Sequence, residues 1–192
     1  MPYPVHPHYI FKVCIIGAGG VGKTCIARRL CFNTFDTETK MTIGINFYTY
    51  DLPIQVDGEK ENLRLSIWDF GGQEQFKKLF PYYVNGANGI FLVFELVNLQ
   101  SLLNLDWWYE QLADYKIDNI PFIVLGTKQD LTDKAESKIK VDDAIISSFL
   151  DKHSQKEFYK TSSKENMNIL ASFQILTKKI LDSTGLNYDK LL

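Results

Sequence analysis

The chain is 192 residues long, with 45% hydrophobic and 23% charged residues, which fits one globular domain with a complete core. Its formal net charge of −2 argues against a dedicated nucleic-acid binder, because such proteins are usually basic. The three cysteines form no Cys-x-x-Cys pair, so we expect reduced thiols rather than a disulfide or metal framework.

Strand patterns recur along the first two thirds of the chain. Residues 1–9 contain three prolines and are expected to form a flexible N-terminal segment. Strands are predicted at residues 10–16, 45–54, 63–68, 89–95 and 121–125. An Asp57-Gly58 pair between the second and third strands predicts a tight hairpin turn. The fourth and fifth strands are continuous apolar runs, which are typical of central parallel strands buried on both faces.

Helical patterns lie between and after these strands. One helix is predicted at residues 22–32. Three more are indicated by apolar residues at helical spacing, namely Leu102, Leu105, Tyr109 and Leu112; Val141, Ile145 and Phe149; and Ile169, Phe173, Leu176 and Ile180. The alternation of strands and helices predicts an α/β domain with a mostly parallel sheet.

A phosphate-loop pattern, GxxxxGK[ST], is matched by residues 17–24 between a predicted strand and a predicted helix. Glycines let such a loop turn its backbone N–H groups toward phosphate oxygens, and the following helix N-terminus favours the same anion. Lys23 can reach the β- and γ-phosphates, and the Thr24 hydroxyl can ligate magnesium. The expected nucleotide contacts in this region are Gly19, Gly20, Val21, Gly22, Lys23, Thr24 and Cys25.

Four further segments follow in the order and rough spacing found in the Ras superfamily, which the chain resembles over residues 10–182. The resemblance implies a P-loop NTPase fold, with a mostly parallel six-stranded sheet, one antiparallel edge strand and about five flanking helices. It implies a G domain at residues 10–182 and a C-terminal tail at residues 183–192. The implied ligands are GTP or GDP, with Mg²⁺ as the cofactor.

Two of these segments resemble the switches of that family. Thr42 begins the run Thr-Ile-Gly-Ile-Asn-Phe, which is similar to switch I of Rab proteins. Residues 68–74, Trp-Asp-Phe-Gly-Gly-Gln-Glu, resemble the DxxGQ motif of switch II, although the Gly-Gly pair is also similar to Arf and Roco GTPases. In that motif Gln73 would orient the attacking water, and the Gly72 N–H would bind the γ-phosphate. The implied catalytic set is Gln73, Lys23, Thr42 and Gly72, and the implied magnesium ligands are Thr24, Thr42 and Asp69.

Two segments resemble the guanine-binding motifs of the family. Residues 127–130, Thr-Lys-Gln-Asp, are similar to NKxD with Thr in place of Asn. Asp130 can accept two hydrogen bonds from guanine, and adenine lacks both donors. Residues 161–164, Thr-Ser-Ser-Lys, resemble the SAK loop, in which the Ser163 N–H would contact guanine O6. The implied base-side contacts are Phe35, which would stack on guanine, with Thr127, Lys128, Asp130, Ser162, Ser163 and Lys164.

Aromatic residues in the switch segments resemble the aromatic triad of Rab proteins: Phe47, Trp68 and either Tyr82 or Tyr83. They could anchor effector, exchange-factor and GTPase-activating proteins, or they could only pack the hairpin against the switch. The stretch between the two switch motifs is a few residues longer than in Ras or Rab proteins. The resemblance therefore identifies no particular effector.

The last four residues, Asp-Lys-Leu-Leu, hold no cysteine for prenylation, and no apolar run is long enough to span a membrane. We therefore expect a cytoplasmic protein that a partner could recruit to membranes.

Three functional hypotheses stay open. The first is a regulated switch that hydrolyses GTP slowly and binds effectors in the GTP state. The second is a nucleotide-locked GTP- or GDP-binding scaffold, and the third is the GTPase domain of a larger Roco-like protein. Gly19, Thr42, Gly72 and Gln73 favour the first hypothesis, because locked relatives commonly lose one of these residues.

Overall fold

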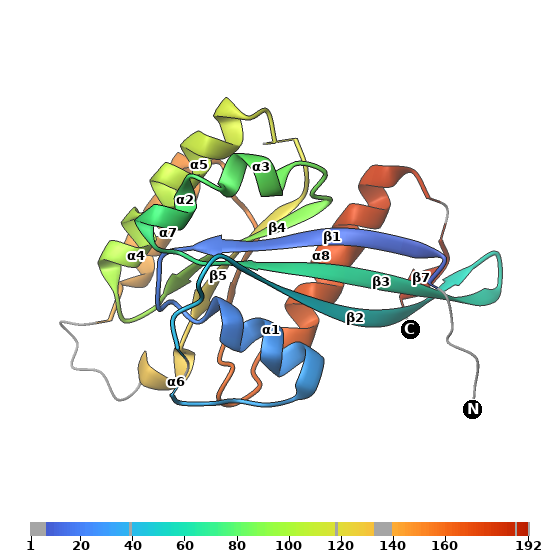
Figure 1. The fold of residues 1–192 in the computed structure, drawn as a ribbon, viewed down its shortest axis with the longest axis horizontal. Coiled ribbons are helices and arrows are strands. Elements are labelled where there is room, and N and C mark those ends of the chain that lie inside the picture. The colour runs from blue at the N-terminus through green and yellow to red at the C-terminus, as the bar shows by residue number, and fades with distance from the viewer. Residues whose placement is uncertain (1–6, 39, 118, 133–139, 187, 192) are drawn as a thin grey trace.

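The computed structural model describes residues 7–38, 40–117, 119–132, 140–186 and 188–191, and its centre is a seven-stranded sheet (Figure 1). The spatial order of the strands is β6-β5-β4-β1-β3-β2-β7. Their bounds are β1 Tyr9–Gly17, β2 Ile45–Val56, β3 Glu59–Phe70, β4 Gly89–Glu95, β5 Phe122–Thr127, β6 Phe158–Lys160 and β7 Lys190–Leu191. Of the segment predicted to be flexible, residues 1–6 lie outside the described residues.

The sheet is mostly parallel, which confirms the predicted fold class. Strands β1, β3, β4, β5 and β6 run parallel, whereas β2 is antiparallel to β3 and β7 is antiparallel to β2. The structure adds a seventh strand to the six predicted: β7, a two-residue strand within residues 183–192, which the sequence predicts to be a tail. Two residues are too few to give a periodic pattern, so only the pairing with Ile54 and Gln55 of β2 reveals this strand.

The β2–β3 hairpin is longer than predicted, and its turn lies where the Asp-Gly pair predicts it. Asp57 has a φ of 50° and Gly58 a φ of 82°, and positive values at both central residues are what a type I′ turn requires. Each strand has 12 residues, so most of the chain between the two switch motifs is paired in this hairpin.

Eight helices are present in the described part of the chain, against about five expected. They are α1 Lys23–Phe32, α2 Glu74–Lys77, α3 Phe80–Val84, α4 Leu99–Leu103, α5 Leu105–Asp114, α6 Gln129–Thr132, α7 Asp143–Lys152 and α8 Ile169–Thr184. Four of them have only four or five residues, which is about one turn. Residues of α1 and α8 join one core cluster, and residues of α3, α4, α5 and α7 join a second on the other face of the sheet. Within the described ranges, no helix has the length and apolar character to cross a lipid bilayer.

The predicted apolar stripes are confirmed for α8 and partly wrong for α7. All four stripe residues of α8 are buried. In α7, Ile145 is 42% exposed, and Ile146 is buried in its place beside Phe149. The helix begins later than the stripe assumed, because the Asp142 side chain caps it by accepting a hydrogen bond from Ala144 N at 2.7 Å. This start sets which face of α7 meets the sheet.

The parallel strands bring the predicted site segments to one edge of the sheet. Residues 17–24 follow the end of β1, residues 71–73 follow β3, residues 127–130 follow β5, and residues 161–164 follow β6. Carboxyl ends of parallel strands lie at the same edge, where α/β proteins usually bind their ligands. The fold therefore gathers segments that are far apart in the sequence.

Candidate functional site

A pocket of about 320 Å³ opens at this edge of the sheet. The predicted site residues that line it are Gly19, Gly20, Gly22, Lys23, Thr24, Cys25, Phe35, Thr42, Gly72, Gln73, Thr127, Lys128, Asp130, Ser163 and Lys164. Three predicted residues do not line it, namely Val21, Asp69 and Ser162, but each hydrogen-bonds to a residue that does. The pocket walls also contain Asp36, Thr37, Lys40, Met41, Phe70 and Leu131, which the motifs did not single out.

The phosphate loop leads into α1 through a residue in the left-handed region. Gly22 occupies the N-cap of α1 with a φ of 95°, a conformation that favours glycine. No side chain caps this helix start, and its first turn contains no acidic residue. The first N–H groups of α1 are thus available to an anion in the pocket, which the positive end of the helix dipole also favours.

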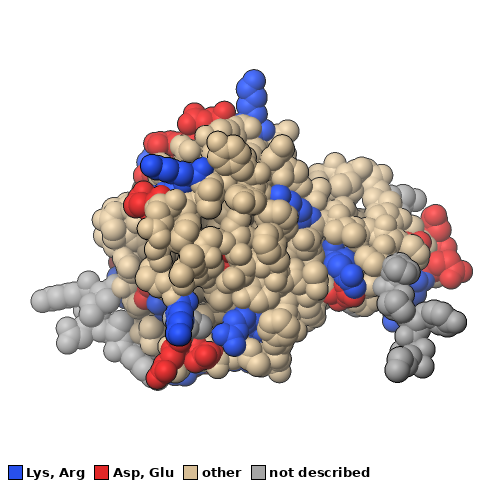
Figure 2. Space-filling model, viewed as in Figure 1, with Lys and Arg blue, Asp and Glu red and all other residues tan. Residues whose placement is uncertain are grey.

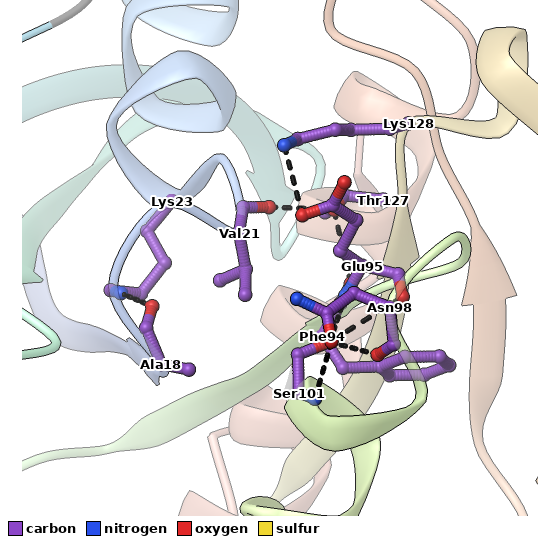
Figure 3. A network of polar contacts seen from close by, with 9 residues as sticks. All are labelled: Ala18, Val21, Lys23, Phe94, Glu95, Asn98, Ser101, Thr127 and Lys128. Carbon is purple, nitrogen blue, oxygen red and sulfur yellow. Dashed lines mark hydrogen bonds and ion pairs between the residues drawn. The ribbon is translucent and has the colours of Figure 1, made fainter. Parts of the chain in front are cut away.

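Lys23 is folded back onto the phosphate loop. Lys23 is only 5% exposed, and its Nζ donates to Gly17 O at 2.9 Å. The same Nζ donates to Ala18 O at 2.6 Å (Figure 3). Burial lowers the pKa of Lys23 to about 8, while the nearby carboxylate of Asp69 acts in the opposite direction. A buried amine beside the loop is positioned to pair with phosphate oxygens.

Three oxygen-bearing side chains from separate segments meet beside Lys23. Thr24 Oγ1 donates to Asp69 Oδ2 at 2.6 Å and lies 2.7 Å from Thr42 Oγ1. The Asp69 side chain is fully buried, and its Oδ1 has no hydrogen-bond partner among the described residues. Burial raises the pKa of Asp69, although the Thr24 hydroxyl and the Lys23 ammonium act against the rise.

This oxygen set fits a magnesium ion. A buried carboxylate oxygen without a partner is costly, and a cation would satisfy it. Mg²⁺ prefers oxygen ligands and is commonly held by one or two carboxylates together with substrate phosphates. Asp69 and the hydroxyls of Thr24 and Thr42 supply such ligands, whereas no cluster of three or more His, Cys, Asp or Glu residues occurs in the described ranges.

The two switch segments, residues 36–48 and 70–84, contact each other and the phosphate loop. Gly71 N donates to Gly44 O at 2.8 Å. A Cβ at Gly72 would lie 2.3 Å from the Ala18 carbonyl carbon, so only glycine fits between switch II and the loop. Gln73 lines the pocket directly after this contact. A change in the conformation of either switch would therefore alter the loop that surrounds the phosphate site.

On the side of the pocket that is predicted to hold the base, Asp130 is held by the loop at residues 161–164. Ser162 Oγ donates to Asp130 Oδ1 at 2.6 Å. The loop is fixed in turn to the end of β5, because Thr161 N donates to Gly126 O at 2.7 Å. One carboxylate oxygen of Asp130 thus has a fixed protein partner, which orients the side chain at the pocket wall.

Thr127 ties three parts of the site together, although it departs from the usual asparagine. Its Oγ1 lies 2.6 Å from Val21 O in the phosphate loop and 3.0 Å from Phe94 O in β4 (Figure 3). The Thr127 side chain is buried, so this hydroxyl has the acceptor that a buried donor needs. A threonine here therefore still joins the base-side strand to the phosphate loop.

Glu95 is a contributor to the site that the motifs did not reveal. Its carboxylate lies 2.9 Å from Lys128 Nζ, and its backbone N donates to Ser101 Oγ at 2.9 Å, so the end of β4 is anchored on both sides (Figure 3). Lys128 itself has a φ of 60°, in the left-handed region. The signal in the sequence is a single carboxylate at the end of an otherwise apolar strand.

The aromatic cluster contains Tyr83 rather than Tyr82. The rings of Phe47 and Trp68 meet edge-on with centroids 4.7 Å apart, and Trp68 lies 6.1 Å from Tyr83. Lys12 Nζ lies 3.7 Å from the centre of the Trp68 ring, a cation–π geometry. Tyr82 is 79% exposed and stands apart from this stack. The cluster packs on the hairpin and still exposes part of its rings, so both of its predicted uses stay possible.

The sequence of this chain is similar to those of known proteins over most of its length. The model of the Ras family matches residues 12–182. The chain is 34% identical to the Ras-related protein YPTC6 of Chlamydomonas reinhardtii over 183 residues, which cover 91% of this chain and 81% of that protein. It is 33% identical to the Ras-related protein Rab-8B of Homo sapiens over 179 residues, with 90% and 79% covered. It is 30% identical to the GTP-binding protein ypt1 of Schizosaccharomyces pombe, with 93% and 84% covered.

Proposed function

Because this chain belongs to the Ras family of small GTPases, we propose that it is a magnesium-dependent switch that alternates between GDP- and GTP-bound states. The single observation that carries the proposal is the meeting of Thr24, Thr42 and Asp69. These residues come from the phosphate loop, switch I and the end of β3. A ligand that recruits all three oxygens would link both switches to the phosphate site.

The proposed nucleotide is guanine-based. Asp130 would accept hydrogen bonds from guanine N1–H and the 2-amino group, and its orientation by Ser162 supports that role. Phe35 lines the same pocket and is 37% exposed, so its ring is available to stack on the base. Lys128 would lie along the base, held by Glu95.

In the proposed reaction, the protein mainly positions groups and neutralises charge. Gln73 orients a water molecule toward the γ-phosphate, while Lys23 and the Gly72 N–H bind the phosphate oxygens. Thr24, Thr42 and Asp69 would hold Mg²⁺, which would supply charge neutralisation of the phosphates. This arrangement lowers the barrier without a covalent intermediate.

Turnover is expected to be slow, because no arginine lines the described walls of the pocket. Arg64 is paired with Asp51 at 2.7 Å on the hairpin, and Arg29 is bound to the base-side loop. Ras itself, without a partner, turns over GTP on the order of 10⁻⁴ s⁻¹ and gains roughly 10⁵-fold from a partner arginine; we adopt that scale for this chain.

The proposed partner surface is the aromatic cluster of Phe47, Trp68 and Tyr83, together with the exposed Ile43. Figure 2 shows that uncharged residues make up most of the middle of this view, with isolated Lys and Arg side chains among them, and Lys12 lies directly over the Trp68 ring. Partly exposed aromatics are the residue type that most often anchors protein partners. We place the protein in the cytoplasm, with recruitment to membranes through such a partner.

The decisive experiment measures bound nucleotide and turnover on the purified protein. Denaturing the purified protein should release GDP or GTP, which chromatography then identifies. Single-turnover hydrolysis of GTP should then depend on added magnesium and run far below 1 s⁻¹. Release of an adenine nucleotide, or a rate above about 1 s⁻¹, would refute the proposed site.

Hydrogen exchange separates the switch from the nucleotide-locked scaffold. Residues 36–48 and 70–84 should be more protected with a non-hydrolysable GTP analogue than with GDP, because Thr42 and Gly72 would contact the γ-phosphate only in the former. Helix α8 provides the internal control, since it packs in the core away from the pocket. Equal protection of the switches in both states would support the scaffold instead.

A further inference from the structure

Arg29 connects α1 to the base-side loop through hydrogen bonds. Its Nε donates to Ser163 O at 2.6 Å, and a terminal nitrogen of the same guanidinium lies 3.3 Å from Lys164 O. These acceptors are 134 and 135 positions away along the chain. One planar side chain therefore holds two successive backbone carbonyl groups of a loop that lines the pocket.

The other terminal nitrogen of Arg29 fixes the end of α1. It donates to Asn33 O at 2.9 Å and to Asn33 Oδ1 at 3.0 Å. Asn33 is the C-cap of the helix, with a φ of 52°, and it lies two positions before Phe35. The same guanidinium thus fixes the start of the segment that carries Phe35 to the pocket.

Holding a carbonyl group also orients the next N–H group. A peptide unit is planar, with its C=O and N–H pointing in opposite directions. When Arg29 holds Ser163 O, the direction of the Lys164 N–H is fixed as well, and this group directly follows the Ser163 residue whose own N–H would contact guanine O6. A guanidinium suits this task because it presents five donors in a rigid plane, whereas a lysine ammonium is a compact charge on a flexible stem.

We propose that Arg29 is a positioning residue for guanine recognition, which sets the backbone of residues 163–164 against the base and couples that loop to Phe35. The inference rests on the proposed function, because it assumes that a guanine base occupies this end of the pocket. Arg29 would not touch the nucleotide. It acts through the loop, so its loss should weaken contacts to the base and leave contacts to the phosphates intact.

The test compares Arg29→Ala with Arg28→Ala and Arg29→Lys. Arg28 is the matched control, because it occupies the adjacent position of α1, is half-buried as Arg29 is and does not line this pocket. The rate of dissociation of a fluorescent GDP should rise on the order of tenfold in Arg29→Ala and less than about threefold in Arg28→Ala. Arg29→Lys should recover little of the loss, since a single ammonium cannot hold the loop and Asn33 together.

A base analogue distinguishes positioning from a general loss of stability. The diphosphate of 2,6-diaminopurine riboside carries an amino group where guanine has O6, so it cannot accept a hydrogen bond from the loop N–H, and it also lacks the N1–H that would donate to Asp130. Arg29→Ala should weaken binding of GDP several-fold more than binding of this analogue. Equal weakening of both ligands would overturn the inference and assign Arg29 to the stability of α1, and so would full recovery in Arg29→Lys. A wild-type protein without preference for GDP over the analogue would instead contradict the proposed function.

Discussion

The two halves of the pocket are held together in different ways. In the base half, formed by residues 127–130 and 161–164, the groups that would face the base are held by other parts of the protein, although the buried Oε1 of Gln129 has no hydrogen-bond partner among the described residues. Ser162 donates to Asp130 at 2.6 Å, and Arg29 donates to the carbonyl groups of the same loop. These contacts belong to the fold, so the shape of the base half is set before any ligand contributes.

In the phosphate half, formed by residues 17–24 and 69–73 with Thr42, the polar groups crowd around one point. Thr24 contacts both Thr42 and Asp69, and Asp69 Oδ1 has no partner within the described residues. If a metal ion and phosphates were bound, the Thr24–Thr42 and Thr24–Asp69 contacts would be replaced by stronger contacts with the ion. We therefore propose that the base half sets the affinity for both nucleotides and that the phosphate half sets the difference between GDP and GTP.

This proposed division of roles can be tested by substitutions in each half of the pocket. A change in the base half should alter the affinities for GDP and GTP by the same factor, because both carry the same base. A change in the phosphate half should alter the GTP-to-GDP affinity ratio or the hydrolysis rate. A base-half variant that discriminates between the two nucleotides would disprove the division.

The largest effect is expected for Asp130→Asn. Loss of two hydrogen bonds between guanine and a charged carboxylate should weaken binding of both GDP and GTP roughly a hundredfold or more. Binding of xanthine nucleotides should improve, because the introduced side-chain amide can donate to the 2-oxo group that the aspartate repels. Competition titrations with GDP, GTP and XDP give the three affinities. Ser162→Ala is the graded control, since it removes only the hydroxyl that orients Asp130.

A smaller and selective effect is expected for Thr24→Asn in the phosphate half. The hydroxyl that contacts both Thr42 and Asp69 is lost, so the magnesium site should be weakened most where two phosphates share the ion. The GTP-to-GDP affinity ratio should fall on the order of 10- to 100-fold. Magnesium titrations at fixed nucleotide provide the measurement. An unchanged ratio would remove Thr24 from the metal site.

Much of the fold and of the pocket could be predicted because the signals are local. The turn at Asp57 and Gly58 depends on two residues that tolerate positive φ values, and the phosphate loop depends on glycines within residues 17–24. Short motifs at the ends of predicted strands must meet at one edge of a parallel sheet. Most of the predicted contact residues accordingly line one pocket, while their roles toward a nucleotide stay predictions.

The rest depended on contacts that leave no local pattern. Strand β7 is defined only by its pairing with β2, far away in the sequence. The acceptors of Arg29 at positions 163 and 164 are backbone carbonyl groups. Every residue has such a group, so the residue types at these positions do not predict the contact. Ile145 was assigned to the core because helical spacing alone cannot show where a helix begins, and the cap at Asp142 decides that.

A third prediction concerns the rate alone. Gln73→Leu should slow single-turnover hydrolysis about tenfold, because the proposed role of Gln73 is to orient water rather than to hold phosphate. Affinities for GDP and GTP should change less than about twofold. The rate is measured at saturating magnesium, with Gln100→Leu as the control for the loss of an exposed amide outside the pocket, because Gln75 donates to Gln73 Oε1 at 3.2 Å and is not independent of it. A large loss of GTP affinity in Gln73→Leu would mean that this residue holds the nucleotide.

The smallest effect is expected for Glu95→Gln in the base half. The ion pair between Glu95 and Lys128 spans 2.9 Å, and its partners are 15% and 34% exposed, so solvent and salt screen part of its energy. Glutamine keeps the shape and one oxygen acceptor but removes the charge that holds Lys128 along the base. We expect about a threefold loss of affinity, equal for GDP and GTP, and a smaller loss at high salt. Lys128→Met provides the matching arm of a double-mutant cycle, because Glu95→Gln should have no further effect once the ammonium is gone. Additive losses in the double variant would mean that the Glu95 carboxylate acts independently of Lys128, since its contact with Ser101 is made by the backbone and stays in Glu95→Gln. Unequal losses for GDP and GTP would contradict the division between the two halves.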